Sequence, residues 1–196
     1  GWAKLSPVQY LRTIIKELPN RLRSIFDSRY DACKKGIFFR RDAISILKQS
    51  SVVETNLVVR RSYSGHSGTA SDTAEKLQKE FVDNLLSSDY GLDVRGDANA
   101  STRLFEILSL GRIPVIVDTE RNFPFSDRID YASFSLIVDF RDIKNLPEKI
   151  AEFHNTISPE HFVEMQKNAR EAYRTYFRID ALTQPLMEEI RKQAGL

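Results

Sequence analysis

The chain has 196 residues, enough for one large α/β domain, and its hydrophobic (41%) and charged (29%) fractions are ordinary for a globular protein. A formal net charge of +2 gives no reason to expect a nucleic-acid partner. The single cysteine, Cys33, excludes an intramolecular disulfide and a cysteine-based zinc site, and it favours a reducing compartment. Because the chain starts at Gly1 without an initiator methionine, we expect it to be part of a longer protein.

The first forty residues predict a helix followed by a basic stretch. Residues 7–18 are typical of a helix, with Ser6 as the N-cap and Pro7 in the first turn. Basic residues outnumber acidic ones over residues 21–41. This pattern favours a solvated helix face plus a loop. The alternative is a surface that faces anionic lipid or anionic polysaccharide.

From residue 36 onward, segments typical of strands alternate with segments typical of helices. The predicted strands are 36–39, 51–59, 90–94, 113–118 and 134–140. The predicted helices are 40–48, 73–86, 101–110, 147–155, a long one that starts at residues 158–160, and 179–194. A polar, Gly- and Ser-rich loop is expected over residues 61–72. The alternation predicts an α/β fold with a doubly wound, mostly parallel, Rossmann-like sheet.

Sheets of this kind bind ligands outside the carboxyl ends of their strands, and the turn that follows Val94 has features suited to an anion there. The helix predicted from Ser101 would offer unpaired amides and a positive dipole end. Gly96 would let the backbone approach a ligand. Arg95 and Arg103 carry forked donors that match phosphate oxygens.

Arg103 and Glu106 are three residues apart, which places both on one face of the predicted helix. A carboxylate at that depth in the helix can accept hydrogen bonds from sugar or ribose hydroxyls. The turn therefore has the features of a cradle for a nucleoside diphosphate. A plain structural turn is the other interpretation, and the spacing alone leaves both open.

Several short motifs imitate other functions. The Arg-Gly-Asp at 95–97 is a three-letter match to a cell-adhesion signal, and the sequon at 99–101 matters only in a secretory lumen. Residues 65–68 miss the nucleophile-elbow pattern by one position. His154 and His161 are separated by a predicted helix break, so a metal site between them is not expected.

The string YGLDVRGDANASTRLFEILSLGRIPVIVD (90–118), with Pro124-Phe125 and the segments 129–138 and 146–150, resembles the exostosin-like glycosyltransferases. That family shows an aromatic strand ending in Arg-Gly, a turn of small residues, Ser-x-Arg, a Glu, and Gly-x-Ile-Pro-Val-Ile with an Asp. The matching positions here are Arg95-Gly96, Ser101-Thr102-Arg103, Glu106, 111–116 and Asp118. The resemblance covers residues 50–177, and residues 55–66 are similar to the donor-side strand and loop of bacterial members.

The resemblance implies a GT-B architecture, in which two Rossmann-like domains face each other and the C-terminal domain holds most of the donor. This chain resembles that C-terminal domain. It would comprise an N-terminal helix and basic linker (1–35), a nucleotide-sugar-binding domain (36–178) and a C-terminal helix (179–196). The resemblance also implies inversion at the anomeric carbon, no obligatory metal, and no cofactor beyond a UDP- or GDP-sugar as donor substrate.

The implied partners are the nucleotide-sugar donor, a glycan acceptor, and an N-terminal acceptor domain or partner subunit, with no nucleic acid. A peripheral membrane contact is a further expectation. The expected location is cytoplasmic or peripheral to the membrane, with the Golgi lumen as the alternative.

The family pattern also implies roles for particular residues. The donor-binding set comprises Arg60, Tyr63, His66, Arg95, Gly96, Asn99, Ser101, Arg103 and Glu106. Within it the arginines and the amides of residues 99–101 would hold the diphosphate, and Glu106 would hold the ribose. An inverting transfer needs a general base; Asp97 and Asp118 are the candidates.

Two positions depart from related patterns. Retaining GT-B enzymes carry a second Glu eight positions before the ribose carboxylate, where this chain has Ala98 beside Asp97. The contact to the donor sugar is therefore unassigned. Asp93 stands where the exostosin-like family often has a small or apolar residue.

Two other functions compete with glycosyl transfer. The chain could be a catalytically inactive nucleotide-sugar-binding or scaffold module of a glycan-synthesis complex. A different doubly wound enzyme or regulator, such as a receiver-like domain, is the other candidate, but the segments 36–39 and 51–59 lack the acidic clusters that a receiver needs.

Overall fold

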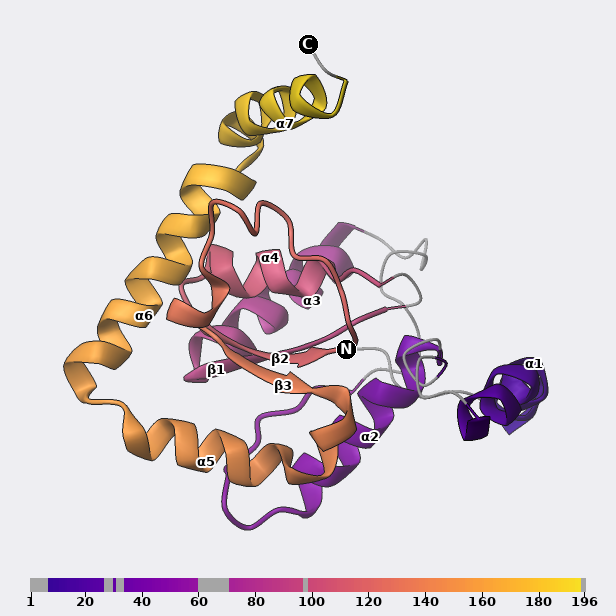
Figure 1. Cartoon of the computed structure of the whole chain (residues 1–196). Helices are drawn as coiled ribbons and strands as arrows, with labels where there is room; N and C mark the ends of the chain where they lie inside the picture. The colour runs from indigo at the N-terminus through magenta and orange to yellow at the C-terminus, as the bar shows by residue number, and fades with distance from the viewer. Residues whose placement is uncertain (1–6, 27–29, 31–33, 60–70, 97–98, 195–196) are drawn as a thin grey trace.

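A computed structural model describes residues 7–26, 30, 34–59, 71–96 and 99–194 (Figure 1). The helices are α1 (Pro7–Phe26), α2 (Gly36–Gln49), α3 (Ser71–Leu86), α4 (Thr102–Ser109), α5 (Leu146–Thr156), α6 (Pro159–Ala172) and α7 (Ile179–Ala194). The strands are β1 (Tyr90–Val94), β2 (Ile113–Asp118) and β3 (Leu136–Asp139). Short helical turns lie at Tyr131–Ser133, Phe140–Asn145 and Tyr173–Phe177.

The three strands form a parallel sheet in the order β1-β2-β3, so the prediction of a parallel sheet is confirmed. In the register, Leu92 pairs with Val115, and Val115 pairs with Leu136. A doubly wound sheet reverses its strand order at a switch point. The described strands run in one order, and the doubly wound topology stays a prediction.

Helices cover both faces of the sheet, which explains why β2 is an unbroken apolar run (Figure 1). On one face, Phe39, Ala43 and Leu47 of α2 pack with Val115 and neighbouring residues of the sheet. On the other face, residues of α4, α6 and the segment 129–134 surround Ile113 and Ile116. The sheet is therefore the middle layer of three.

Two predicted strands are wrong. Residues 36–39 are the first turn of α2, because a run of four apolar residues does not distinguish a strand from a buried helix. In the helix these residues serve two contacts: Phe39 faces the sheet, whereas Ile37 and Phe38 pack beside α1. Residues 54–59 lie outside any ladder, so the predicted strand 51–59 does not form.

The other predicted helices and strands are confirmed: β1, β2 and α7 have the predicted bounds, and the rest have shifted ends. Of the predicted loop 61–72, residues 61–70 lie outside the described residues, and 71–72 begin α3. Ser101 caps α4 by accepting a hydrogen bond from the Arg103 amide at 3.2 Å. Ser158 caps α6 in the same way at the His161 amide, with Pro159 at the first helical position. The helix predicted over 7–18 continues past Pro19 to Phe26, and Ser6 lies outside the described residues.

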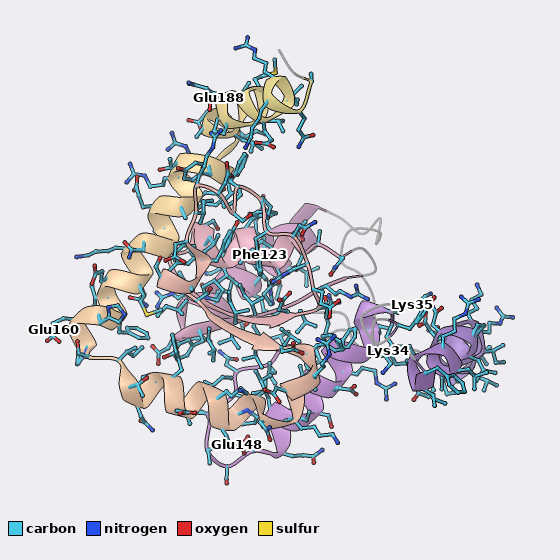
Figure 2. All side chains as sticks on the ribbon, viewed as in Figure 1. Lys34, Lys35, Phe123, Glu148, Glu160 and Glu188 are labelled. Carbon is cyan, nitrogen blue, oxygen red and sulfur yellow. The ribbon has the colours of Figure 1, made fainter. Side chains whose placement is uncertain are left out.

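The two terminal helices lie at the periphery (Figure 1). α1 rests on α2, where the rings of Tyr10 and Phe38 meet edge to face with centroids 6.2 Å apart. α7 is tied to the connection after β2 by an ion pair of 2.8 Å between Arg128 Nη1 and Glu188 Oε2. Figure 2 shows Glu188 on α7 and the labelled Lys34 and Lys35 near the start of α2.

Candidate functional site

The carboxyl ends of β1 and β2 are joined through Asn99, which lies in the turn between β1 and α4. Its Nδ2 donates to the carbonyl oxygens of Thr119 (3.3 Å) and Glu120 (3.2 Å). Its Oδ1 accepts a hydrogen bond of 2.8 Å from Thr119 Oγ1. Gly96 N donates to Ala100 O at 3.4 Å and closes the turn. The loop after β1 is thereby fixed against the loop after β2.

The loop after β2 is fixed in turn to β3. Glu120 has a φ of 58°, in the left-handed region that a non-glycine residue seldom adopts. Its carboxylate pairs with Arg141, which also pairs with Asp139 at 3.0 Å. Asp118 accepts a hydrogen bond of 3.2 Å from the Arg121 amide and so stabilises the same turn.

Asp93 has a buried partner that the sequence did not reveal. Arg121 Nη2 lies 2.5 Å from Asp93 Oδ2, and the two side chains are 3% and 0% exposed. The guanidinium also lies over the ring of Phe123, at 4.9 Å from its centroid. A carboxylate inside a strand covered on both faces requires such a partner. The departure from the family pattern at position 93 is therefore compensated from the loop after β2.

Arg95 is buried between the end of β1 and α2. Its guanidinium donates to the carbonyl oxygen of Lys34 and lies 5.4 Å from the centre of the Phe39 ring. A Cβ added at Gly36 would overlap the carbonyl oxygens of Arg95 and Gly96, so α2 begins in contact with the turn. At Gly96, by contrast, an added Cβ would meet no atom within 4 Å.

Arg103 and Glu106 lie on the side of α4 that faces α3 and the cavity between them. Arg103 Nη1 is 3.5 Å from Glu106 Oε2, and both side chains are partly exposed. The Arg103 guanidinium stacks 4.3 Å from the centre of the Phe81 ring of α3. Partial burial raises the pKa of Glu106 above its ordinary value; Arg103 opposes the rise, and Asp93 adds to it.

A cavity of about 550 Å³ lies beside β1, in the size range of small-molecule sites. Arg103 and Glu106 form part of its wall. Most of the remaining wall comes from α2, α3, β1 and residues 53–59, including Arg40, Phe81, Asn84, Tyr90 and Leu92. The last described residue before Arg60 is Val59, which also lines this cavity.

The structure thus divides the predicted donor-binding residues into three groups. Arg103 and Glu106 lie on one face of α4, as their spacing predicted, and this face borders the cavity. Gly96, Asn99 and Ser101 shape the turn and the start of α4, and Arg95 is buried. The remaining residues lie outside the described residues: Arg60, Tyr63, His66 and the candidate base Asp97.

Two arginines were missed by sequence reasoning. Arg121 could have been found from Asp93, because a charge within a buried strand implies a nearby counter-charge. Arg40 donates to the carbonyl oxygens of Val94 and Arg95, both at 3.2 Å, and lines the cavity. Assigning residues 36–39 to a strand hid it, because the true helix carries Arg40 to the end of β1.

Among the described residues, no three or more His, Cys, Asp or Glu side chains gather as metal ligands. Within the same part of the chain, every helix is too short or too polar to cross a membrane.

Residues 34–153 match the family model of the Exostosin GT47 domain. The chain is 31% identical over 107 residues to an Exostosin-1 homolog of Caenorhabditis elegans, covering 55% of this chain and 27% of that protein. It is 30% identical over 96 residues to a probable glycosyltransferase of Arabidopsis thaliana, covering 49% of this chain and 18% of the relative.

The matched segment therefore spans about a quarter of the first relative and less than a fifth of the second. The family model covers more than half of the chain and includes β1, α4, β2 and the cavity residues on α4. The resemblance read from the sequence is confirmed, and the chain belongs to the exostosin GT47 family.

Proposed function

We propose that this chain supplies the donor-binding part of a glycosyltransferase, which transfers a sugar from a nucleoside-diphosphate sugar to a glycan acceptor. The observation that carries the proposal is the Arg103–Glu106 pair, placed in the first turns of α4 and open to the cavity beside β1. Membership of the exostosin GT47 family supports the same reaction class.

The positive charge at the start of α4 suits the departure of a diphosphate leaving group. When the glycosidic bond of the donor breaks, negative charge builds on the leaving diphosphate, and a cation already in place stabilises it without reorganising. Arg103 supplies such a charge, and the positive end of the α4 dipole adds to it. Glu106 would accept hydrogen bonds from the ribose hydroxyls. Arg60, Tyr63 and His66 would complete the donor site, since they follow Val59 in the sequence and Val59 lies at the cavity wall.

The finer features remain proposals. The transfer would invert the anomeric centre, without a metal, in a GT-B enzyme whose acceptor domain lies elsewhere in the polypeptide or in a partner subunit. Asp97 and Asp118 are the proposed general bases. Since Asp118 already accepts a bond from the Arg121 amide, its second oxygen would take the acceptor proton. The proposed location is cytoplasmic or peripheral to the membrane, with the Golgi lumen as the alternative.

Calorimetric titration with UDP and GDP tests the proposal. Arg103→Ala removes a charge-assisted contact, so the affinity should fall about tenfold to a hundredfold. Arg174→Ala is the matched control, because Arg174 also pairs with a Glu three residues away (Glu171, 3.8 Å) but lies outside the cavity. Equal affinity of the Arg103→Ala variant and the parent chain would refute the assignment.

An inactive nucleotide-sugar-binding or scaffold module is the second candidate, because Asp118, the candidate base within the described residues, already accepts a hydrogen bond from the Arg121 amide in its own turn. Donor hydrolysis or transfer by a longer chain that includes the acceptor part would separate the two. Binding without turnover in that longer chain would establish the scaffold.

A further inference from the structure

α1 carries an apolar stripe that nothing in the described structure covers. Six of its aliphatic residues are each at least half exposed: Val8, Leu11, Ile15, Leu18, Leu22 and Ile25. Their spacing alternates between three and four residues. At about 100° of rotation per residue they occupy one arc of roughly 100° along the whole helix. Phe26, at 91% exposure, extends the stripe at its end.

The stripe is separate from the side by which α1 attaches to the protein. Tyr10 and Ile14 pack against Ile37 and Phe38 of α2, and the Arg41 guanidinium lies 4.6 Å from the centre of the Tyr10 ring. By helical geometry, Tyr10 lies about 110° and Ile14 about 70° around the helix from the middle of the stripe, so the attached side adjoins one border of the stripe. The attachment of α1 therefore leaves its apolar arc facing outward, and Figure 1 shows α1 away from the sheet.

The charges of α1 are also sorted by face. Arg12, Lys16 and Arg23 are exposed, and their positions follow the apolar arc on the side away from α2. The sole carboxylate in Pro7–Phe26 is Glu17, which is buried (5% exposed) on the attached side. The surface around the stripe thus carries basic groups and no acidic group from the helix itself.

We propose that α1 lies along an anionic lipid surface, with the stripe from Val8 to Ile25 in the interfacial region and Arg12, Lys16 and Arg23 at the headgroups. A helix with one aliphatic face bordered by cations is the amphipathic type that binds in the plane of a membrane. This inference goes beyond glycosyl transfer and does not depend on it. A surface facing anionic lipid was the alternative interpretation of the basic stretch 21–41; the proposal places the lipid contact on α1, which includes only residues 21–26 of that stretch.

A comparison with α7 shows why the basic residues of α1 indicate an anionic membrane. It too exposes aliphatic residues, such as Leu186 and Ile190. Its sequence, however, holds Asp180, Glu188 and Glu189 against Arg191 and Lys192, so acidic groups outnumber basic ones. An anionic surface would repel part of α7, which makes it an internal control with similar apolar exposure.

Co-sedimentation of the full chain with vesicles tests the proposal. The chain should bind vesicles of equimolar phosphatidylcholine and phosphatidylserine, bind phosphatidylcholine alone far less, and dissociate as salt is raised. Ile15→Gln with Leu22→Gln should lower partitioning about a hundredfold. Arg12→Gln with Lys16→Gln should lower it about thirtyfold on the anionic vesicles.

Leu186→Gln with Ile190→Gln on α7 is the matched control and should leave binding unchanged. All six substituted positions are exposed, so each variant should keep the parent's thermal midpoint and circular dichroism. The proposal fails if the parent does not bind anionic vesicles, or if the α1 variants bind as well as the parent. It also fails if sedimentation shows a dimer that the Ile15/Leu22 variant abolishes, since the stripe would then be covered by a second copy.

Discussion

Two arginine–carboxylate pairs lie near the carboxyl end of β1, and they differ in their access to water. Asp93 and Arg121 form a contact of 2.5 Å and are almost completely buried. Arg103 and Glu106 lie 3.5 Å apart with partly exposed side chains. A buried pair suffers a large desolvation cost if one partner is lost, whereas an exposed pair contributes little to folding. The Asp93–Arg121 pair therefore stabilises the carboxyl end of the sheet, whereas the Arg103–Glu106 pair is the one that a ligand can reach.

Removing one partner of the buried pair should give the largest effect. Arg121→Met leaves the Asp93 carboxylate buried without its counter-charge, so the free energy of unfolding should fall by about 3–5 kcal/mol. Arg103→Met, at the exposed pair, should change it by less than about 1 kcal/mol. Urea denaturation measures both values.

The double variant Asp93→Leu/Arg121→Met sharpens this contrast. Because it removes both charges at once, it should recover much of the stability lost in Arg121→Met. Equal unfolding free energies for the two single arginine variants would show that burial does not separate the pairs.

Substituting the two glycines near the carboxyl end of β1 should also have unequal effects on stability, with the larger loss at the more crowded position. Gly36→Ala places a Cβ 2.0 Å from the Gly96 carbonyl oxygen, so the backbone must shift, and it should cost about 1–3 kcal/mol. Gly96→Ala places the same atom in open space and should stay within about 0.5 kcal/mol of the parent. Thermal unfolding of both variants checks the difference, and a stable Gly36→Ala protein would disprove the tight contact between α2 and the turn.

The smallest effect is expected from the change in Glu106 protonation with pH, measured as a change in nucleotide affinity. The pKa of Glu106 is raised, so its carboxylate takes up a proton at a higher pH than an ordinary Glu. Affinity for a nucleoside diphosphate should therefore weaken severalfold as the pH falls through that raised value. Glu106→Gln should lack this component, and its affinity should be lower at neutral pH.

The contribution of Glu106 to stability should change with pH in the opposite direction to its contribution to affinity. The folded state binds the Glu106 proton more tightly than the unfolded state does, so this group favours folding below its ordinary pKa. That contribution is lost as the pH rises through the folded pKa.

The binding experiment needs a control for the nucleotide itself, whose phosphates also titrate with pH. The parent chain and the Glu106→Gln variant share that phosphate titration, so the difference between their affinity–pH profiles isolates Glu106. Identical pH profiles would remove Glu106 from the site.

Local signals predicted β1, β2 and the start of α4, because apolar runs and a serine cap act within a few residues. The same reasoning placed Arg103 and Glu106 together, since three residues along a helix is a local relation. It failed at residues 36–39, where both a strand and a buried helix fit four apolar residues. It also missed the Arg121 partner of Asp93, because a contact across 28 positions is set by the packing of the sheet.

The hydrogen bonds of Asn99 have a consequence for the Asn-Ala-Ser sequon that begins there. Its side-chain nitrogen already serves two carbonyl oxygens, and its oxygen serves Thr119. An N-linked glycan would be attached to that same nitrogen and would compete with these hydrogen bonds between the loops after β1 and β2. In any compartment that modifies sequons, the order of events would decide the outcome. A glycan attached during synthesis would prevent the hydrogen bonds of Asn99 from forming. A chain that folds first would keep Asn99 in these bonds and so shield it from glycosylation.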